Sequence, residues 1–365
     1  MKLQKIIDKL QGVMNLDFDK RAQYFEKYRD ILESEITANP TNIEAYCLAA
    51  MITCELREET ERSIKILEQC YAKNQSNFSD EGFSLWATYM AYFLLEECGE
   101  NGEERAIQLL SQAISLNSKY ASTYYAYGKV CFAKKDFKEA SKLFHKASEL
   151  SSKKSYKYCE AVSLMAYSEH NEGIAILKSI YSYPFEDEEI DVRIALTLGR
   201  ELAISGNVAE AKKIAEILLK TDYKKFDMEI DEMADFMYIL GDYKTCIELY
   251  NKYQFFEDSN WLNKYFYALK QIGQTNIAEK ALQEITEKIE KTIYEETMNI
   301  GDWDSYEDYE YYISSETKRL KDIMDGYNKV FIHSIDILPD VYNDIFYECY
   351  YINCPRHIPS PSASC

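Results

Sequence analysis

The chain has 365 residues, of which 47% are hydrophobic and 28% charged, and its formal net charge is -20. Its length exceeds the roughly 250 to 300 residues at which one hydrophobic core stops growing, so two domains or an elongated array are expected. The acid excess argues against nonspecific binding to nucleic acid, because phosphate contacts need clustered Lys and Arg.

Glycine and proline are scarce, with 12 Gly and 6 Pro, and four of the prolines lie at or after Pro339. Because these residues interrupt helices, their scarcity predicts an all-α chain with short connections. Several of the ten cysteines lie in helical apolar patterns, which favours free thiols in a reducing compartment. Charges are spaced through the N-terminus, and no stretch approaches the roughly 18 apolar residues of a membrane helix, so we expect a cytoplasmic protein.

Residues 1–42 are predicted to form an N-terminal helical cap. Apolar residues recur there at helical spacing, and the following are assigned to the core: Ile6, Ile7, Leu10, Tyr24, Tyr28, Ile31 and Leu32.

Residues 43–293 contain a repeating pattern of two amphipathic helices joined by a short polar turn. It is clearest from Tyr120 to Ser152. The first helix of this unit carries Tyr124, Tyr127, Gly128 and Cys131 on one face, and the second carries Phe137, Ala140, Phe144, Ala147 and Leu150.

This unit resembles the tetratricopeptide repeat family, in which a large residue, Leu-Gly and an aromatic on the first helix meet Ala, aromatic and Ala on the second. Small side chains at Gly128 and Ala140 allow the two helices to cross closely. The resemblance implies a right-handed superhelical solenoid of about seven antiparallel helix pairs with helical caps.

Three later units fit the same pattern, and they place Gly206, Gly241 and Gly273 in turns where a positive φ is often needed. Their other matched positions include Ala195, Leu198, Gly199, Val208, Ala211, Leu218, Met233, Met237, Cys246, Tyr250, Leu262, Leu269, Ile277, Ala278 and Ile285. Looser units are assigned from Tyr46 to Cys70, from Leu85 to Leu116 and from Tyr158 to Ile180.

Residues 294–352 depart from the repeat and are predicted to be a C-terminal helical capping segment. Ser305 and Asp308 resemble a capping box that opens a helix. Its inward positions are assigned to Tyr309, Tyr312, Ile313, Leu320, Ile323, Met324, Tyr327 and Phe331. Pro339 would open a further helix ending near Tyr351, and the Pro and Ser content of residues 353–365 is typical of a disordered tail.

No pattern of catalysis or cofactor binding is recognised, and we expect neither an enzyme nor a bound cofactor. The four histidines lie far apart in the sequence. Asp302 and Asp304 begin like a calcium loop, but Glu307 replaces the glycine that such a loop needs. Cys349, Cys354, His357 and Cys365 match no compact zinc module, so no metal site is assigned.

The resemblance also implies where a partner binds. In tetratricopeptide arrays the second, fifth, sixth and ninth positions of each unit line the concave groove. The corresponding candidate partner-binding residues here are Tyr125, Lys129, Arg193, Arg200, Asp231, Asp235, Lys264 and Tyr267, with Glu232 and Asn263 beside them. They differ from the Lys and Asn set by which the chaperone-binding members hold a terminal carboxylate.

The leading hypothesis is an interaction scaffold or adaptor that binds a peptide or protein in this groove, and does not bind nucleic acid or a membrane. One alternative is a peptide-sensing regulator, because the bacterial pheromone regulators resemble this chain in carrying an array of similar length. Another is an enzyme with its activity in residues 294–365.

Overall fold

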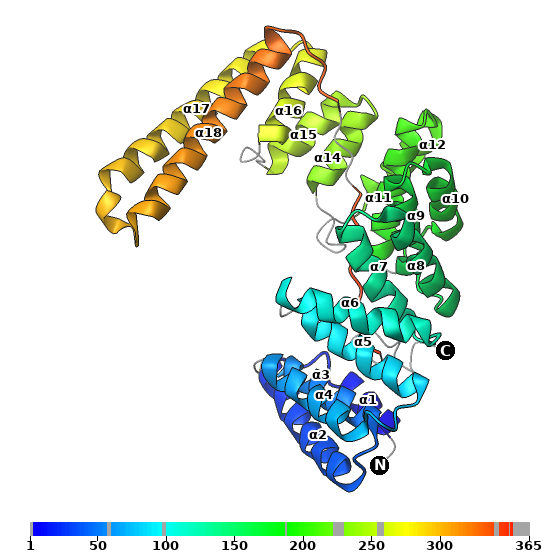
Figure 1. The fold of residues 1–365 in the computed structure, drawn as a ribbon. Coiled ribbons are helices and arrows are strands. Elements are labelled where there is room, and N and C mark those ends of the chain that lie inside the picture. The colour runs from blue at the N-terminus through cyan, green and yellow to red at the C-terminus, as the bar shows by residue number, and fades with distance from the viewer. Residues whose placement is uncertain are drawn as a thin grey trace. The chain divides into compact units, whose positions relative to one another are not determined.

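A computed structural model describes residues 3–56, 60–96, 100–186, 188–221, 230–253, 259–338, 343–349 and 351–352. Within these ranges the chain forms 17 α-helices, a short 3-10 helix and no strand. It divides into two compact units: unit 1 takes in Met1–Ile180 and Asp344–Cys365, and unit 2 takes in Tyr181–Asn343. The predicted all-α repeat solenoid is confirmed (Figure 1).

Unit 1 holds two N-terminal helices and four helix pairs. Its helices are α1 (Leu3–Gln11), α2 (Phe18–Ala38), α3 (Ile43–Glu55), α4 (Thr60–Asn74), α5 (Asp80–Glu96), α6 (Glu100–Ser115), α7 (Ala121–Ala133), α8 (Phe137–Leu150), α9 (Lys154–Ala166) and α10 (His170–Ile180).

Unit 2 holds three helix pairs and a final long helix. Its helices are α11 (Glu188–Ile204), α12 (Val208–Leu218), α14 (Ile230–Ile239), α15 (Tyr243–Tyr253), α16 (Ser259–Gln271), α17 (Thr275–Met298) and α18 (Tyr306–Phe331). The pairs begin at α3 and end with α17, so the described residues contain the expected seven.

Small residues set the distance between the helices of a pair. Ala140 and Ala147 on α8 are fully buried. A Cβ atom added to Gly128 on α7 would lie 2.8 Å from the ring of Phe144 on α8, closer than packed atoms approach. The close crossing predicted at Gly128 and Ala140 is therefore confirmed, and it fixes which side chains of α7 lie in the core.

The five turns inside pairs that the structure describes share one backbone geometry. Gly206, Gly241 and Gly273 have φ of 87°, 72° and 74°, as predicted, and Lys135 and Ser168 adopt φ of 62° and 76° in the corresponding turns. In each turn the next residue donates its N–H to a carbonyl five positions back, as Asp242 does to Met237 at 3.0 Å. This bond satisfies a carbonyl left over at the end of the first helix.

Five side chains assigned to the core are instead more than one third exposed. Tyr24 is 43% exposed because α2 turns Phe25, Tyr28 and Leu32 inward. Leu150, Val208 and Ile277 are 40%, 39% and 39% exposed because they lie in the terminal turns of their helices. Met324 on α18 is 47% exposed, while the core positions of that helix are Tyr309, Ile323, Gly326 and Val330.

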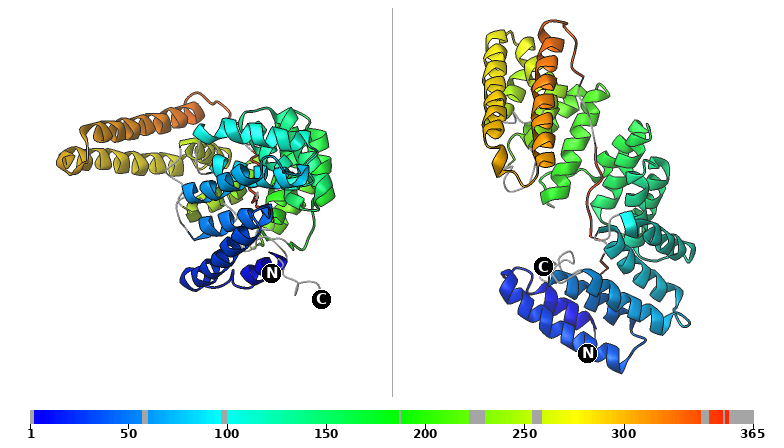
Figure 2. Two further views of the ribbon diagram at one scale, coloured as in Figure 1. Left: turned by 60° about the horizontal axis from the view of Figure 1, so that its bottom comes forward. Right: turned by 60° about the vertical axis from the view of Figure 1, so that its left-hand side comes forward.

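The C-terminal helices form a long antiparallel hairpin, in which α17 and α18 lie side by side (Figures 1 and 2). The predicted cap at Ser305 is confirmed: its hydroxyl accepts from the Asp308 N–H at 3.1 Å. The prediction of a further helix from Pro339 to Tyr351 is wrong for residues 343–349, which are not helical. Residues 339–342 and the predicted disordered tail at 353–365 lie outside the described residues.

The crossing of α7 and α8 generates a stability prediction. We expect Ala140→Glu to lower the free energy of unfolding by at least ~3 kcal/mol, because a carboxylate would be buried at a fully covered position. Thermal melting measures the change. Lys142→Glu, an exposed site two residues away on α8, is the control and should leave the melting temperature nearly unchanged.

The shared turn geometry generates a second prediction, with effects of opposite sign. Gly241→Ala should destabilise the protein by about 1 kcal/mol, because a Cβ atom is disfavoured at positive φ. Lys135→Gly should stabilise it by about 0.5 kcal/mol, since relief of that strain slightly exceeds the entropy cost of glycine. Chemical denaturation that shifted both midpoints in the same direction would contradict this account.

Candidate functional site

The chain beyond α18 lies along the first helices of the pairs. We call the described residues 332–338, 343–349 and 351–352 the tail segment; it is coloured orange to red in Figure 1. In each unit, the side of the first helices that it contacts is called the first-helix face of that unit. Of its described residues, 332–338 and Asn343 belong to unit 2 and contact the face there, and 344–349 and 351–352 belong to unit 1 and contact the face there.

In unit 2, two first helices bind the start of the tail segment. From α16, Lys270 donates to the Ser334 hydroxyl at 3.2 Å, and Tyr267 donates to the Asp336 carboxylate at 3.1 Å. From α14, Tyr238 donates to the carbonyl of Ile337 at 2.6 Å. One of these three acceptors is a main-chain atom.

Helix α11 binds the side chain of Asn343 from both ends of its amide. Arg200 donates to the amide oxygen at 3.0 Å, and the amide nitrogen donates to the Glu201 carboxylate at 2.7 Å. Arg200 and Glu201 are buried, with 5% and 3% exposure. Because each charged group contacts the part of the amide that complements it, the pair is specific for Asn or Gln.

In unit 1 the contacts are mostly to the peptide backbone. The Tyr125 hydroxyl of α7 donates to the carbonyl of Phe346 at 2.8 Å and accepts from the N–H of Glu348 at 2.7 Å. On α9, Tyr158 donates to the carbonyl of Asp344 at 3.2 Å, and the Cys159 thiol donates to Phe346 at 3.5 Å. These bonds use groups that a helix would need internally, so the segment remains extended.

Two side chains of the tail segment are also recognised in unit 1. The carboxylate of Glu348 pairs with Lys153 at 2.5 Å and accepts from the Ser155 hydroxyl at 2.7 Å. The ammonium of Lys129 lies 4.3 Å from the centre of the Tyr347 ring. An acidic residue and its aromatic neighbour are thus both held by lysines.

Tyr351 is the buried anchor of the tail segment, with 6% exposure. Its ring centre lies 5.2 Å from that of Tyr89, 4.1 Å from Tyr92 and 5.6 Å from Phe93, all on α5. Tyr89 also donates a hydrogen bond to the carbonyl of Ile352. Burial raises the pKa of the Tyr351 phenol well above its ordinary value, so the ring enters this cluster uncharged.

The predicted partner-binding residues fall into two groups. Tyr125, Lys129, Arg200 and Tyr267 contact the tail segment. The remainder, Arg193, Asp231, Asp235 and Lys264, lie on the first helices α11, α14 and α16.

Two ion pairs account for three residues of the second group. Arg193 pairs with Glu232 at 2.7 Å, and Lys264 pairs with Asp235 at 2.6 Å. These pairs connect neighbouring first helices, so their charges are already balanced within the array. Asp231 is partly buried on α14.

Sequence reasoning missed most of the groups that bind the tail segment, including Tyr89, Lys153, Ser155, Tyr158, Glu201, Tyr238 and Lys270. One feature of three of these residues could have indicated their role. Tyr89, Tyr158 and Tyr238 are buried like Phe, with 1%, 1% and 4% exposure, yet they carry a hydroxyl. A Tyr at such a position indicates a hydrogen-bond partner at the end of the ring.

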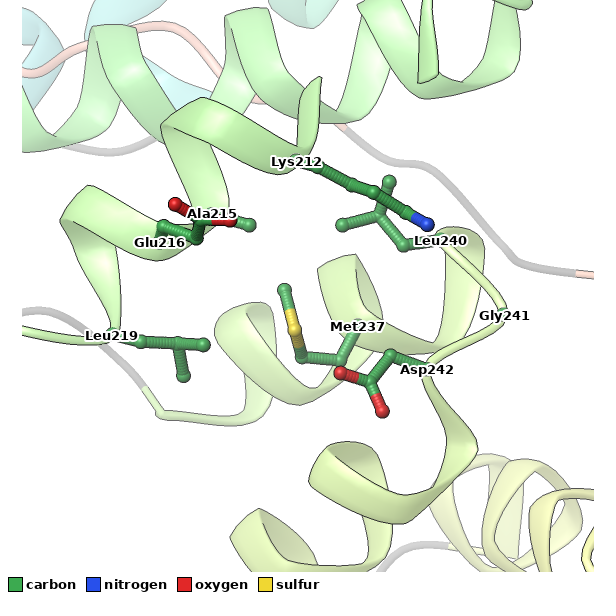
Figure 3. Close-up of a pocket in the computed structure, with 8 residues that line it drawn as sticks. All are labelled: Lys212, Ala215, Glu216, Leu219, Met237, Leu240, Gly241 and Asp242. Atoms are coloured by element: carbon green, nitrogen blue, oxygen red, sulfur yellow. The ribbon is translucent and has the colours of Figure 1, made fainter. Parts of the chain in front are cut away.

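A separate cavity of about 400 Å³ lies between α12 and the α14–α15 turn (Figure 3). Its wall combines Ala215, Leu219, Met237 and Leu240 with the charged side chains of Lys212, Glu216 and Asp242. None of the predicted partner-binding residues lines it.

No candidate metal site is found in the described part of the chain. Among the residues that the structure describes, no group of three or more His, Cys, Asp or Glu could hold a metal ion. Three of the possible zinc ligands in the sequence, Cys354, His357 and Cys365, lie outside that part of the chain. Within the same residues, no helix has the length and apolar character to cross a membrane.

Comparison with known families supports the repeat assignment over the N-terminal part of the chain. Residues 14–171, less than half of the chain, match the family model described as Integrator complex subunit 8, TPR repeats. No curated protein matches the chain significantly.

Solved structures similar to the chain include three of low identity. Yeast Tom70 is 12% identical, with 87% of this chain and 63% of that chain covered and a TM-score of 0.42. Naa15/Naa10 bound to HypK-THB is 11% identical, with 92% of this chain and 53% of that chain covered and a TM-score of 0.35. The P58(IPK) TPR domain is 10% identical, with 91% of this chain and 99% of that chain covered and a TM-score of 0.21. The chain spans less than two thirds of the first two structures.

The two hydrogen bonds of Tyr125 generate a prediction about the tail segment. In Tyr125→Phe the Glu348 N–H loses its acceptor, so its hydrogen exchange should become roughly tenfold faster, as expected for about 1–1.5 kcal/mol. Exchange in α7 and α8 should stay unchanged. Tyr46→Phe is the matched control, since among the described residues the buried Tyr46 hydroxyl has no hydrogen-bond partner. Equal exchange in the two variants would contradict the assignment.

Proposed function

Because the chain is a scaffold of tetratricopeptide-type helix pairs, we propose that it binds an extended segment of a protein partner on the first-helix face. The observation that carries this proposal is the two-bond contact of Tyr125 with the backbone of Phe346 and Glu348. Such a contact requires an extended peptide and does not depend on the identity of its side chains.

Packing fixes hydrogen-bonding groups on the first-helix face of unit 1. With the tail segment in place, Tyr125 and Tyr158 are 0% and 1% exposed. The Tyr125 ring centre lies 5.7 Å from that of Phe144 and 5.4 Å from that of Tyr156 in the repeat core, so its hydroxyl is held in place by contacts that do not involve the tail segment. Prepositioned donors lose little conformational freedom on binding. The face in unit 1 therefore supports recognition of a peptide backbone by rigid groups.

Selectivity comes from charged groups on the first-helix face of each unit. Although the net charge of the chain is -20, Lys129 and Lys153 both act on the tail segment in unit 1. In unit 2, Arg200 and Glu201 together select an amide side chain. These contacts support a partner segment that carries acidic and amide residues.

A peptide-sensing regulator would use the same face and would differ in what peptide binding triggers.

The cytoplasm remains our proposed location. The buried cysteines Cys47, Cys70, Cys131, Cys159 and Cys246 are not in disulfides. Burial raises the pKa of the Cys131 thiol to about 11, so this thiol stays protonated and unreactive at neutral pH.

Affinity capture from native lysate tests the proposal. A partner retained by the wild type should be lost, by at least about tenfold in recovery, from a Tyr125→Phe, Lys153→Glu variant, which removes a backbone contact and reverses a charge. Hydrogen exchange of the complex should then show protection in α7 and α9.

The matched control is Tyr46→Phe, Lys142→Glu. It makes the same two chemical changes at a buried hydroxyl that has no hydrogen-bond partner among the described residues and at an exposed lysine of α8. Both variants must melt near the wild-type temperature. If both retained the same proteins as the wild type, the partner would bind elsewhere and the proposal would fail.

A further inference from the structure

We infer that the tail segment is a displaceable occupant of the peptide-binding face in unit 1, and that its own sequence describes the partner. The partner segment would be extended and would carry an acidic residue followed, three positions later, by an aromatic one, as Glu348 and Tyr351 do. This inference rests on the proposed function and adds the chemistry of the ligand and its regulation.

In unit 1 the tail segment contributes one side chain, that of Tyr351, to the buried core, and its other described residues there are at least partly exposed. Among them, Asp344 and Tyr347 are exposed. The repeat core beneath it is closed by contacts between helices, as between α7 and α8. Release of the segment therefore leaves the helix pairs packed, which a displaceable ligand requires.

Glu348 supplies the acidic element of the motif. Its carboxylate is 14% exposed and is held by an ammonium at 2.5 Å and a hydroxyl at 2.7 Å. Lys153 and Ser155 come from the start of α9, so they are fixed relative to each other. A neutral amide in the place of Glu348 would keep the shape and lose the charge, which makes the preference for an acid measurable.

Tyr351 supplies the aromatic element. It enters a cluster of Tyr89, Tyr92 and Phe93 on α5, and the bond from Tyr89 to Ile352 holds the backbone beside it. Aromatic rings packed at these distances stabilise a contact beyond the area that they bury. The spacing to Glu348 follows from the positions of α5 and α9, which lie on either side of α7 in the chain order.

Covalent attachment makes the tail segment an effective competitor. A segment joined to its binding face by a short connection acts at an effective concentration on the order of 1 mM. If the free segment bound with a dissociation constant on the order of 100 µM, the attached one would weaken an external peptide roughly tenfold, because only the open fraction can bind.

The test compares full-length chains by fluorescence anisotropy. The probe is a labelled synthetic peptide with the sequence of residues 343–352, NDIFYECYYI. The tail variant carries Glu348→Lys and Tyr351→Ala. We expect it to bind the probe at least tenfold more tightly than the wild type, whose face is occupied. A probe carrying the same two substitutions should bind the tail variant at least tenfold more weakly than the unchanged probe.

A matched control separates release of the face from the change in composition. Glu307→Lys with Tyr311→Ala makes the same substitutions on α18, where Glu307 is exposed and Tyr311 is 79% exposed. This variant should bind the probe as weakly as the wild type. If the double tail variant does not fold, Glu348→Gln replaces it, with an expected gain of at least threefold.

A charge exchange tests the acidic element directly. When Lys153→Glu is added to the tail variant, the unchanged probe should bind at least tenfold more weakly, and a probe with Lys at the position of Glu348 should recover part of the loss. Failure of both effects would overturn the assignment of Glu348 as a recognised residue.

The outcomes also distinguish the two levels of the proposal. Equal binding of the probe to wild type and tail variant would overturn the competition by the tail segment and leave peptide binding on this face intact. Binding to neither, with hydrogen exchange showing residues 343–352 released in the tail variant, would overturn both. Unchanged protection of those residues would show that Glu348 and Tyr351 do not hold the segment, and would overturn the inference alone.

Discussion

The hydrogen bonds made by buried tyrosines are the interaction on which the candidate site depends. In Tyr125 and Tyr158 the ring packs in the core and the hydroxyl donates a hydrogen bond to the tail segment, so one side chain serves both packing and recognition. The Tyr125 ring can adopt few positions because α7 and α8 cross closely at Gly128 and Ala140. The positions of the hydroxyl groups on the binding face are therefore set by the packing beneath them.

Much of the fold was predictable because its determinants are local. A helix pair shows itself in apolar spacing, in the glycines of its turn and in small residues at its crossing, all within a few turns of one another along the chain. The same reasoning erred at Leu150 and Val208, since periodicity indicates a face and does not indicate where the neighbouring helix stops covering it.

The tail segment was not predictable in the same way. Its conformation is determined by partners such as Tyr125, more than 200 positions away in the sequence, and not by its own residues. Pro339 favoured a following helix by a local rule, yet residues 343–349 are extended because their backbone groups bind side chains of the first helices. Half of the candidate partner-binding residues contact this segment, while Arg193, Asp235 and Lys264 take part in ion pairs between helices.

The aromatic cluster around Tyr351 has a spectroscopic consequence. Four rings, from Tyr89, Tyr92, Phe93 and Tyr351, are held in a fixed asymmetric arrangement with centres as close as 4.1 Å. Rigid aromatic surroundings of this kind produce circular dichroism in the near ultraviolet, which is lost when the packing around the rings is lost. The protein therefore carries an intrinsic optical reporter for the state of its tail segment, readable without any label while the far-ultraviolet signal of its helices stays constant.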